Sequence, residues 1–205
     1  MARRIESHWI AGPDGQLEAI LEEPEAQPFT RTALVCHPHP LYGGTMHNKV
    51  VYRVARALRH TGAVVLRFNF RGVGRSQGKH AHGEGELDDA RAALGWLRAR
   101  YPSLPFELAG FSFGARVVTR LGCEEKPARL IALGFPTKGM DTTFLQFCAV
   151  EKVFIQSTHD EHGPKVELEQ VFAKFAEPKQ LIWIPARDHF FEGGLDLLEK
   201  AVAEL

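Results

Sequence analysis

The pentapeptide Gly110-Phe111-Ser112-Phe113-Gly114 carries the strongest chemical signal in this chain. It follows a short apolar stretch, 106–110, that predicts a β-strand, and it precedes a stretch, 115–121, that predicts a helix. A serine on a sharp strand-to-helix turn projects its hydroxyl from the sheet, and flanking glycines remove the Cβ atoms that would clash there. We therefore predict that Ser112 is a nucleophile with helix N–H groups beside it. The alternative interpretation is a plain glycine turn that carries an exposed serine.

Strand-like and helix-like stretches alternate along most of the chain, which is typical of a parallel sheet with helical crossovers. An antiparallel hairpin of strands 4–10 and 16–22 should come first, around Gly12-Pro13-Asp14-Gly15, because this sequence has the composition of a turn. The later predicted strands are 32–36, 63–70, 106–110, 130–135, 152–156 and 180–184. The predicted helices are 48–61, 115–121, 166–175 and a terminal helix from Leu195. A further helix is predicted where Leu87, Ala90, Leu94 and Leu97 recur at helical spacing. The pattern predicts an α/β fold with a mostly parallel, doubly wound sheet, and we expect one domain over 1–205.

Composition limits the classes of partner. Lys plus Arg and Asp plus Glu both number 25, so the formal net charge is zero and nothing favours a nucleic acid as partner. The basic N-terminus lacks a following apolar stretch, and no run approaches the roughly 18 apolar residues of a membrane helix. We expect a cytoplasmic protein that does not bind membranes. The three cysteines, Cys36, Cys123 and Cys148, are too few and too scattered to predict a disulfide framework.

Two further loops connect the serine motif to a known family. His37-Pro38-His39-Pro40-Leu41-Tyr42-Gly43-Gly44 follows the strand ending at Cys36, and Asn69-Phe70-Arg71-Gly72-Val73-Gly74-Arg75-Ser76 follows the next strand. With the serine pentapeptide, these segments make the whole chain resemble the α/β-hydrolases, in particular small bacterial members with a His-Pro-His-Pro-x-x-Gly-Gly loop. The resemblance implies an α/β-hydrolase fold.

A base and an acid are needed next, because a serine hydroxyl is a poor nucleophile until its proton is removed. In the family the order along the chain is serine, acid, histidine. His189 is the histidine that follows the last predicted strand, and its segment resembles the family's Asp-His-Phe-Phe. Asp160 takes the acid position by resemblance to a Gly-x-x-Asp-x-x-x-Pro pattern, although Ser157 stands where the family usually has glycine. Glu161 and Asp188 are rival carboxylates.

Two backbone N–H groups should stabilise the negative charge that acyl transfer builds on the substrate oxygen. The first is that of Phe113, the residue after the nucleophile. The family resemblance assigns the second to His39, because Pro38 and Pro40 have no N–H; Leu41 and Tyr42 stay open as donors. Side chains expected to border the substrate are Leu41, Tyr42, Phe111 and Phe190.

Other kinds of site are disfavoured. His37, His39, His47, His159 and His162 lie on predicted loops without the cysteine or carboxylate partners of usual metal sites, so we expect no metal. Gly78-Lys79 is not followed by Ser or Thr, which excludes a P-loop, and no GxGxxG follows the first strand. The reaction should therefore need no cofactor.

The stretch 137–150, between the predicted strands ending at Phe135 and starting near Glu151, is too short for a helical cap domain. We therefore expect a shallow, open site and a small-molecule acyl substrate. The main hypothesis is a serine hydrolase that cleaves small or short-chain carboxylic esters through an acyl-enzyme, in a monomer or small homo-oligomer.

Three alternatives share parts of this pattern. A thioesterase and an aminopeptidase-like amide hydrolase would use the same residues on other acyl bonds. A non-catalytic binding protein could retain the hydrolase fold. Activity should rise as His189 loses its proton, since only a neutral imidazole can act as a base.

Overall fold

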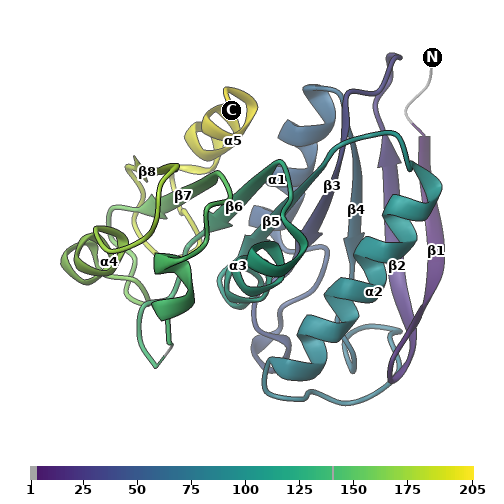
Figure 1. Cartoon of the computed structure of the whole chain (residues 1–205), viewed down its shortest axis with the longest axis horizontal. Coiled ribbons are helices and arrows are strands. Elements are labelled where there is room, and N and C mark those ends of the chain that lie inside the picture. Colours follow the sequence, from purple (N-terminus) through teal and green to yellow (C-terminus); the bar gives the residue numbers. More distant parts are fainter. Residues whose placement is uncertain (1–3, 140) are drawn as a thin grey trace.

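The computed structural model describes residues 4–139 and 141–205 and is built on one eight-stranded sheet (Figure 1). In spatial order the strands are β1 (Arg4–Gly12), β2 (Gly15–Glu23), β4 (Ala63–Phe68), β3 (Arg31–Cys36), β5 (Phe106–Phe111), β6 (Arg129–Leu133), β7 (Lys152–Ser157) and β8 (Lys179–Ile184). The helices are α1 (Lys49–His60), α2 (Glu84–Arg100), α3 (Phe113–Glu125), α4 (Lys165–Phe172) and α5 (Leu195–Ala203), with 3-10 turns η1 (Pro40–Tyr42) and η2 (Thr143–Gln146).

The N-terminal hairpin is confirmed. Strands β1 and β2 pair antiparallel from Arg4 opposite Glu23 to Gly12 opposite Gly15, so Pro13 and Asp14 form a two-residue turn. Strand β2 also pairs antiparallel with β4, whereas the six strands β3 to β8 are parallel to one another. The sheet is therefore mostly parallel, with its antiparallel part at the N-terminal edge.

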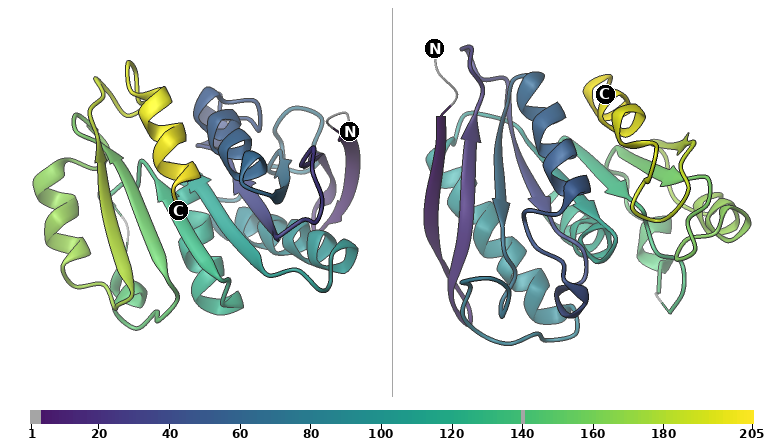
Figure 2. Two further views of the ribbon diagram at one scale, coloured as in Figure 1. Left: turned by 90° about the horizontal axis from the view of Figure 1, so that it is seen from above. Right: turned by 180° about the vertical axis from the view of Figure 1, so that it is seen from behind.

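Helices cover both faces of the sheet, which is why its central strands are mostly apolar (Figure 2). Alternate residues enter two separate cores: in β4, Leu66 and Phe68 pack toward α2 and α3, whereas Val65 packs toward α1 and α5. Helices α1 and α5 lie side by side and are joined by Arg53 and Arg56 of α1, which bind Glu199 of α5.

Two predicted strands are shorter than their apolar runs. Strand β4 ends at Phe68 instead of Phe70, because after the Asn69 N–H, which donates to the Glu18 carbonyl of β2 at 2.8 Å, the Phe70 N–H donates to the His37 side chain and not to a strand. Strand β6 ends at Leu133 instead of Phe135, because Gly134 has a positive φ of 52°. Phe70 and Phe135 remain buried, so burial and not strand pairing accounts for their apolar character.

The connection between β6 and β7 contains no cap. Leaving out residue 140, which is not described, this segment forms only the one-turn helix η2 and irregular backbone. Within the described part of the chain, no helix has the length and apolar character needed to cross a bilayer.

The cysteines differ from the sequence-based expectation. Cys123, at the end of α3, and Cys148, after η2, form a disulfide, whereas Cys36 is a buried free thiol. The two Cα atoms lie 5.3 Å apart although 25 positions separate the residues in sequence. This pairing depends on η2 packing against α3, which the cysteine count could not reveal.

Thiol titration checks this pairing. In denaturant without a reductant, the purified protein should show one reactive thiol, from Cys36, and after reduction it should show three. Three reactive thiols before reduction, in protein purified without a reductant, would contradict the Cys123–Cys148 bond.

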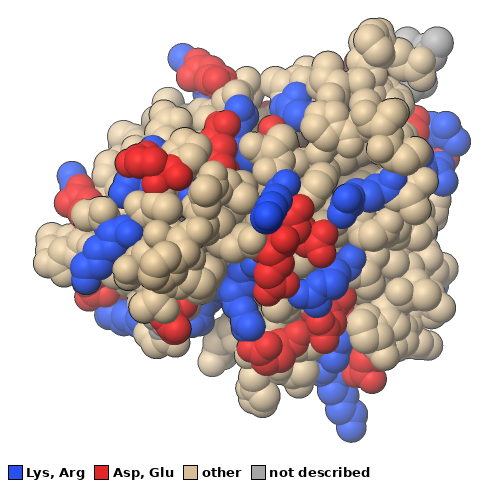
Figure 3. All heavy atoms as spheres, viewed as in Figure 1, with Lys and Arg blue, Asp and Glu red and all other residues tan. Residues whose placement is uncertain are grey.

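Charged side chains of both signs are interleaved on the face covered by α2 and α3 (Figure 3). Arg91 of α2 pairs with Glu124 of α3 at 2.6 Å, and Glu84 of α2 pairs with Arg120 of α3. These exposed pairs join the two helices and leave no large patch of one sign on this face.

Candidate active site

Ser112 lies at the predicted sharp turn between β5 and α3. Its φ of 56° and ψ of −116° are rare for a residue with a side chain, and strain of this kind is common at functional sites. The backbone is fixed on both sides, since Ser112 N–H donates to Leu133 of β6 and the Ser112 carbonyl accepts from Ala115 of α3. The hydroxyl makes no hydrogen bond to any described residue, so it stays available for chemistry.

The two glycines of the pentapeptide are required by close backbone contacts. A Cβ atom on Gly110 would lie 2.3 Å from the Gly114 carbonyl oxygen. A Cβ atom on Gly114 would lie 2.4 Å from the Cys36 carbonyl oxygen, at the end of β3. Both contacts are shorter than any tolerable carbon–oxygen separation, so the turn can form only with glycine at these positions.

His189 and Asp160 are brought together from the ends of β8 and β7. The His189 Nδ1 lies 2.8 Å from the Asp160 Oδ2, and the two residues are only 2% and 4% exposed. The His189 ring stacks on Phe111 with ring centroids 4.9 Å apart, while its Nε2 is buried and unpartnered among the described residues. The imidazole is thus held through Nδ1, and Nε2 is left to exchange a proton.

The rival carboxylates have other roles. Glu161 accepts the backbone N–H of His189 at 3.1 Å through Oε2, and Asp188 accepts the backbone N–H of Glu192 at 2.9 Å through Oδ1. Neither contacts the imidazole ring. The geometry thus favours Asp160 as the partner of His189, as expected from the sequence.

Gln156 is a buried residue of this site that the sequence did not single out. Its Nε2 donates to Asp160 Oδ2 at 2.9 Å, on the same oxygen that faces His189, and its Oε1 accepts the Phe135 N–H at 2.8 Å. The Asp160 Oδ1 accepts the N–H groups of His162 and Gly163. The carboxylate is therefore fixed by four donors when His189 is included. The sequence did contain a signal for this role, because Gln156 is a polar residue inside a mostly apolar strand.

Four backbone N–H groups near Ser112 were expected or open as donors to a substrate oxygen. Leu41 N–H donates to the His39 ring at 3.2 Å, and Tyr42 N–H donates to the His39 carbonyl at 3.1 Å, so both open alternatives are already engaged. The N–H groups of Phe113 and His39 have no partner among the described residues. Both residues line the cavity that contains Ser112.

His37 ties the loop of His39 to the end of β4. Its Nδ1 donates to the Pro38 carbonyl at 2.6 Å, and its Nε2 accepts the Phe70 N–H at 3.0 Å. This pattern requires a neutral ring with the proton on Nδ1. Burial lowers the pKa of His37 from 6.5 to about 4, which keeps the ring neutral in the folded protein.

Acid should destabilise the fold through His37. The unfolded chain binds a proton on this ring near pH 6.5, whereas the folded protein does so only near pH 4, so the unfolded state gains protons first as pH falls. The stabilisation is complete above pH 6.5 and should fall by about 3 kcal/mol by pH 4. Urea titrations between these pH values measure it. His37→Asn, which retains a donor near Nδ1, should lose this pH-dependent part of the free energy of unfolding. His47→Asn, at an exposed loop residue, should keep it. If the free energy of unfolding falls equally with pH in the intact protein and both variants, His37 is not the residue responsible.

A cavity of about 310 Å³ contains Ser112, His189, Phe113 and His39 in its lining. Tyr42 and Phe190 also line it, as expected for residues beside a substrate. Two expectations were wrong. Leu41 is 65% exposed and does not line the cavity, because η1 turns its side chain to solvent. Phe111 is buried behind the His189 ring, so it supports the histidine instead of bordering the cavity.

The remaining histidines make other contacts. His159 Nδ1 lies 2.9 Å from the Ala186 carbonyl oxygen, and His162 packs edge-on against the His189 ring at 4.6 Å. In the described ranges no group of three or more histidine, cysteine or acidic side chains is arranged to hold a metal ion.

Comparison with known proteins places this geometry in a family. A family model described as an alpha/beta hydrolase domain matches residues 33–194, from β3 to the loop after His189. The chain belongs to the α/β-hydrolase family. An α/β serine hydrolase homologue from Coxiella burnetii is 36% identical, with a TM-score of 0.93 over 97% of this chain and 96% of the other. A member of the α/β serine hydrolases without a lid, from Xanthomonas campestris, is 37% identical, with a TM-score of 0.92 over 100% and 94%.

Similarity extends to an uncharacterized protein of Rickettsia prowazekii, which is 35% identical over 95% of this chain and 85% of its own length. The α/β-hydrolase fold without a cap, expected from the sequence, is therefore confirmed.

Proposed function

We propose that this α/β-hydrolase is a serine hydrolase that cleaves small or short-chain carboxylic esters through an acyl-enzyme. One observation carries the proposal: His189 is held by Asp160 through Nδ1, while its Nε2 is unpartnered beside the cavity that contains the free hydroxyl of Ser112. The serine hydrolases among similar structures support the same class.

The proposed reaction has two steps. The Ser112 Oγ attacks the ester carbonyl carbon while His189 Nε2 takes its proton, and the Phe113 and His39 N–H groups bind the oxygen that becomes negative. The carbonyl reforms, the alcohol leaves with the proton from His189, and Ser112 remains acylated. Water then attacks the acyl-enzyme with His189 again as base, which releases the acid and restores Ser112.

The cavity volume supports a small substrate. About 310 Å³ is near the lower end of ligand sites, which commonly measure about 300 to 1,000 Å³, and no cap deepens it among the described residues. A short acyl group fits this space better than a long one.

Labelling with a fluorophosphonate probe tests the proposal. Mass spectrometry should locate the probe on Ser112, and Ser112→Ala should not be labelled. A panel of ester, thioester and amide substrates with the same short acyl group should then favour the ester. A higher kcat/KM on the thioester or the amide would identify the protein as a thioesterase or an amide hydrolase instead. A protein that is neither labelled nor active on any of these substrates would favour a non-catalytic binding protein.

A further inference from the structure

Two cationic side chains line the cavity around Ser112. Arg116 of α3 and Lys138, in the loop after β6, both line it, together with three histidines. No Asp or Glu is among its lining residues in the described part of the chain. Lys138 is exposed and makes no ion pair with a described residue. In a chain with equal numbers of acidic and basic residues, such a local excess of positive charge indicates a negatively charged ligand.

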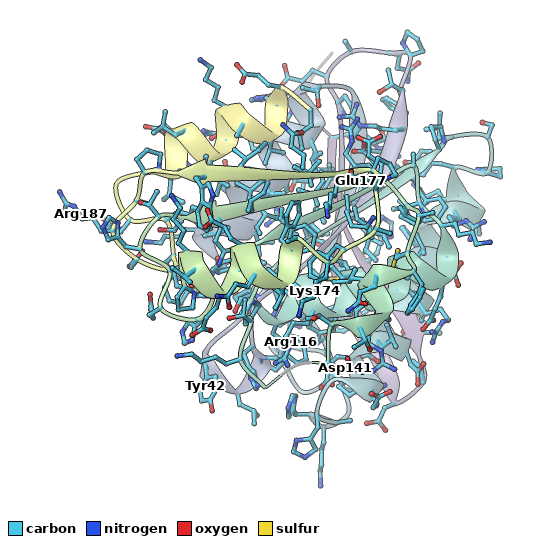
Figure 4. All side chains as sticks on the ribbon, turned by 60° about the vertical axis from the view of Figure 1, so that its left-hand side comes forward. Tyr42, Arg116, Asp141, Lys174, Glu177 and Arg187 are labelled. Atoms are coloured by element: carbon cyan, nitrogen blue, oxygen red, sulfur yellow. A yellow bond between two sulfur atoms is a disulfide. The ribbon has the colours of Figure 1, made fainter. Side chains whose placement is uncertain are left out.

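The neighbouring cavity provides the contrast. It measures about 800 Å³ and shares Phe113 and Arg116 with the first cavity, but Glu84, Glu124 and Asp141 line it. Figure 4 shows Arg116 between Tyr42, which borders the Ser112 cavity, and Asp141, which borders the larger one. The larger cavity therefore has mixed charge, whereas the described lining of the Ser112 cavity contains Arg116 and Lys138 and no carboxylate.

Arg116 is well placed to bind an anion near the reacting carbon. It lies in the first turn of α3, four positions after Ser112, and both residues line the cavity. One guanidinium nitrogen donates to the Gly139 carbonyl at 3.0 Å, which orients the group beside the cavity. Burial lowers the pKa of Arg116, so the cation has lost part of its hydration and gains from an anion beside it.

We propose that the substrate of this site carries an anionic group, such as a carboxylate, near the scissile carbonyl, and that Arg116 and Lys138 bind it. This inference rests on the proposed ester hydrolysis, because Ser112 defines the reacting carbon. It makes Arg116 and Lys138 residues that determine specificity, distinct from the residues proposed to move protons.

Two matched pairs of esters test the proposal, each differing in one charge. The first pair, mono-4-nitrophenyl adipate and 4-nitrophenyl hexanoate, places the carboxylate on the acyl part. The second pair, 4-acetoxybenzoate and its methyl ester, places it on the alcohol part. We expect the intact enzyme to prefer the charged member of at least one pair in kcat/KM, and that pair shows which part of the substrate holds the anion.

Substitutions of Arg116 and Lys138 test whether these residues cause the preference for the charged ester. Arg116→Gln should lower the charged-to-neutral ratio of kcat/KM by about 10- to 100-fold, the loss expected for a hydrogen bond between charged groups, and Lys138→Gln should lower it less because Lys138 is exposed. Arg116→Lys should restore part of the ratio. Arg120→Gln, one turn further along α3 and lining only the larger cavity, is the matched control and should keep it.

The outcomes separate this inference from the proposed function. If the neutral esters are hydrolysed through Ser112 but neither pair shows a charge preference, or if Arg116→Gln and Lys138→Gln both keep the ratio, the anion site is wrong and ester hydrolysis stands. If Ser112→Ala hydrolyses all four esters as fast as the intact enzyme, the proposed function fails and this inference fails with it. Fluorophosphonate labelling of the Arg116, Lys138 and Arg120 variants, which retain Ser112, shows whether each of them is folded.

Discussion

Replacing Ser112 with alanine should lower kcat for a short-chain 4-nitrophenyl ester by about 10⁴- to 10⁶-fold. The hydroxyl is the atom proposed to attack the ester, and no other described nucleophile lines the cavity with an unpartnered histidine nitrogen beside it. The loss should appear in kcat and kcat/KM alike, because the bond to Oγ forms only during the reaction.

The fold should survive this change. Alanine has the same Cβ atom as serine, so it meets the same backbone strain at φ 56°, and the Ser112 hydroxyl makes no hydrogen bond that alanine would lose. Circular dichroism and thermal unfolding therefore serve as controls. Ser103→Ala, in the exposed turn before β5, should retain the turnover of the intact protein. Turnover in Ser112→Ala within tenfold of the intact protein would remove Ser112 from the mechanism.

Local sequence patterns predicted the parts of the structure that local chemistry determines. The turn at Ser112 could be predicted because it requires its two glycines: a Cβ atom on Gly110 or Gly114 would lie only 2.3 or 2.4 Å from a backbone oxygen. The hairpin could be predicted for the same reason, since Gly12 and Gly15 flank a two-residue turn. Strand ends were harder, because Phe70 and Phe135 are as apolar as strand residues but are buried outside the sheet.

Contacts between distant segments could not be predicted from local patterns, and the assignment of the acid to Asp160 depended on the family resemblance. The choice of Asp160 over Glu161 depends on which carboxylate faces the end of β8, and the two residues are adjacent in sequence. The Cys123–Cys148 bond depends on η2 lying against α3. Gln156 supports Asp160 only because the loop after β7 folds back over its own strand. In each case the sequence contains the residue, but the partner is defined by tertiary structure.

The second large effect is expected in Asp160→Asn, whose kcat should fall by about 10⁴-fold. The Asp160 Oδ1 accepts two backbone N–H groups, from His162 and Gly163, so the amide oxygen of asparagine should take that position. The amide NH₂ then faces His189 Nδ1, which must accept a hydrogen bond instead of donating one. The imidazole proton moves to Nε2, and the nitrogen beside the cavity can no longer act as a base.

Glu161→Gln and Asp188→Asn are the matched controls for this substitution. Each removes a carboxylate near His189 while keeping an amide oxygen that can accept the same backbone N–H, so kcat should stay within a few-fold of the intact protein. Unfolding in urea shows whether the variants remain folded. A loss in Glu161→Gln as large as that in Asp160→Asn would mean that charge near His189, and not the hydrogen bond at Nδ1, governs the base. The 2.8 Å contact and the two donors on Oδ1 argue for the hydrogen bond, because they determine which atom of residue 160 the imidazole meets.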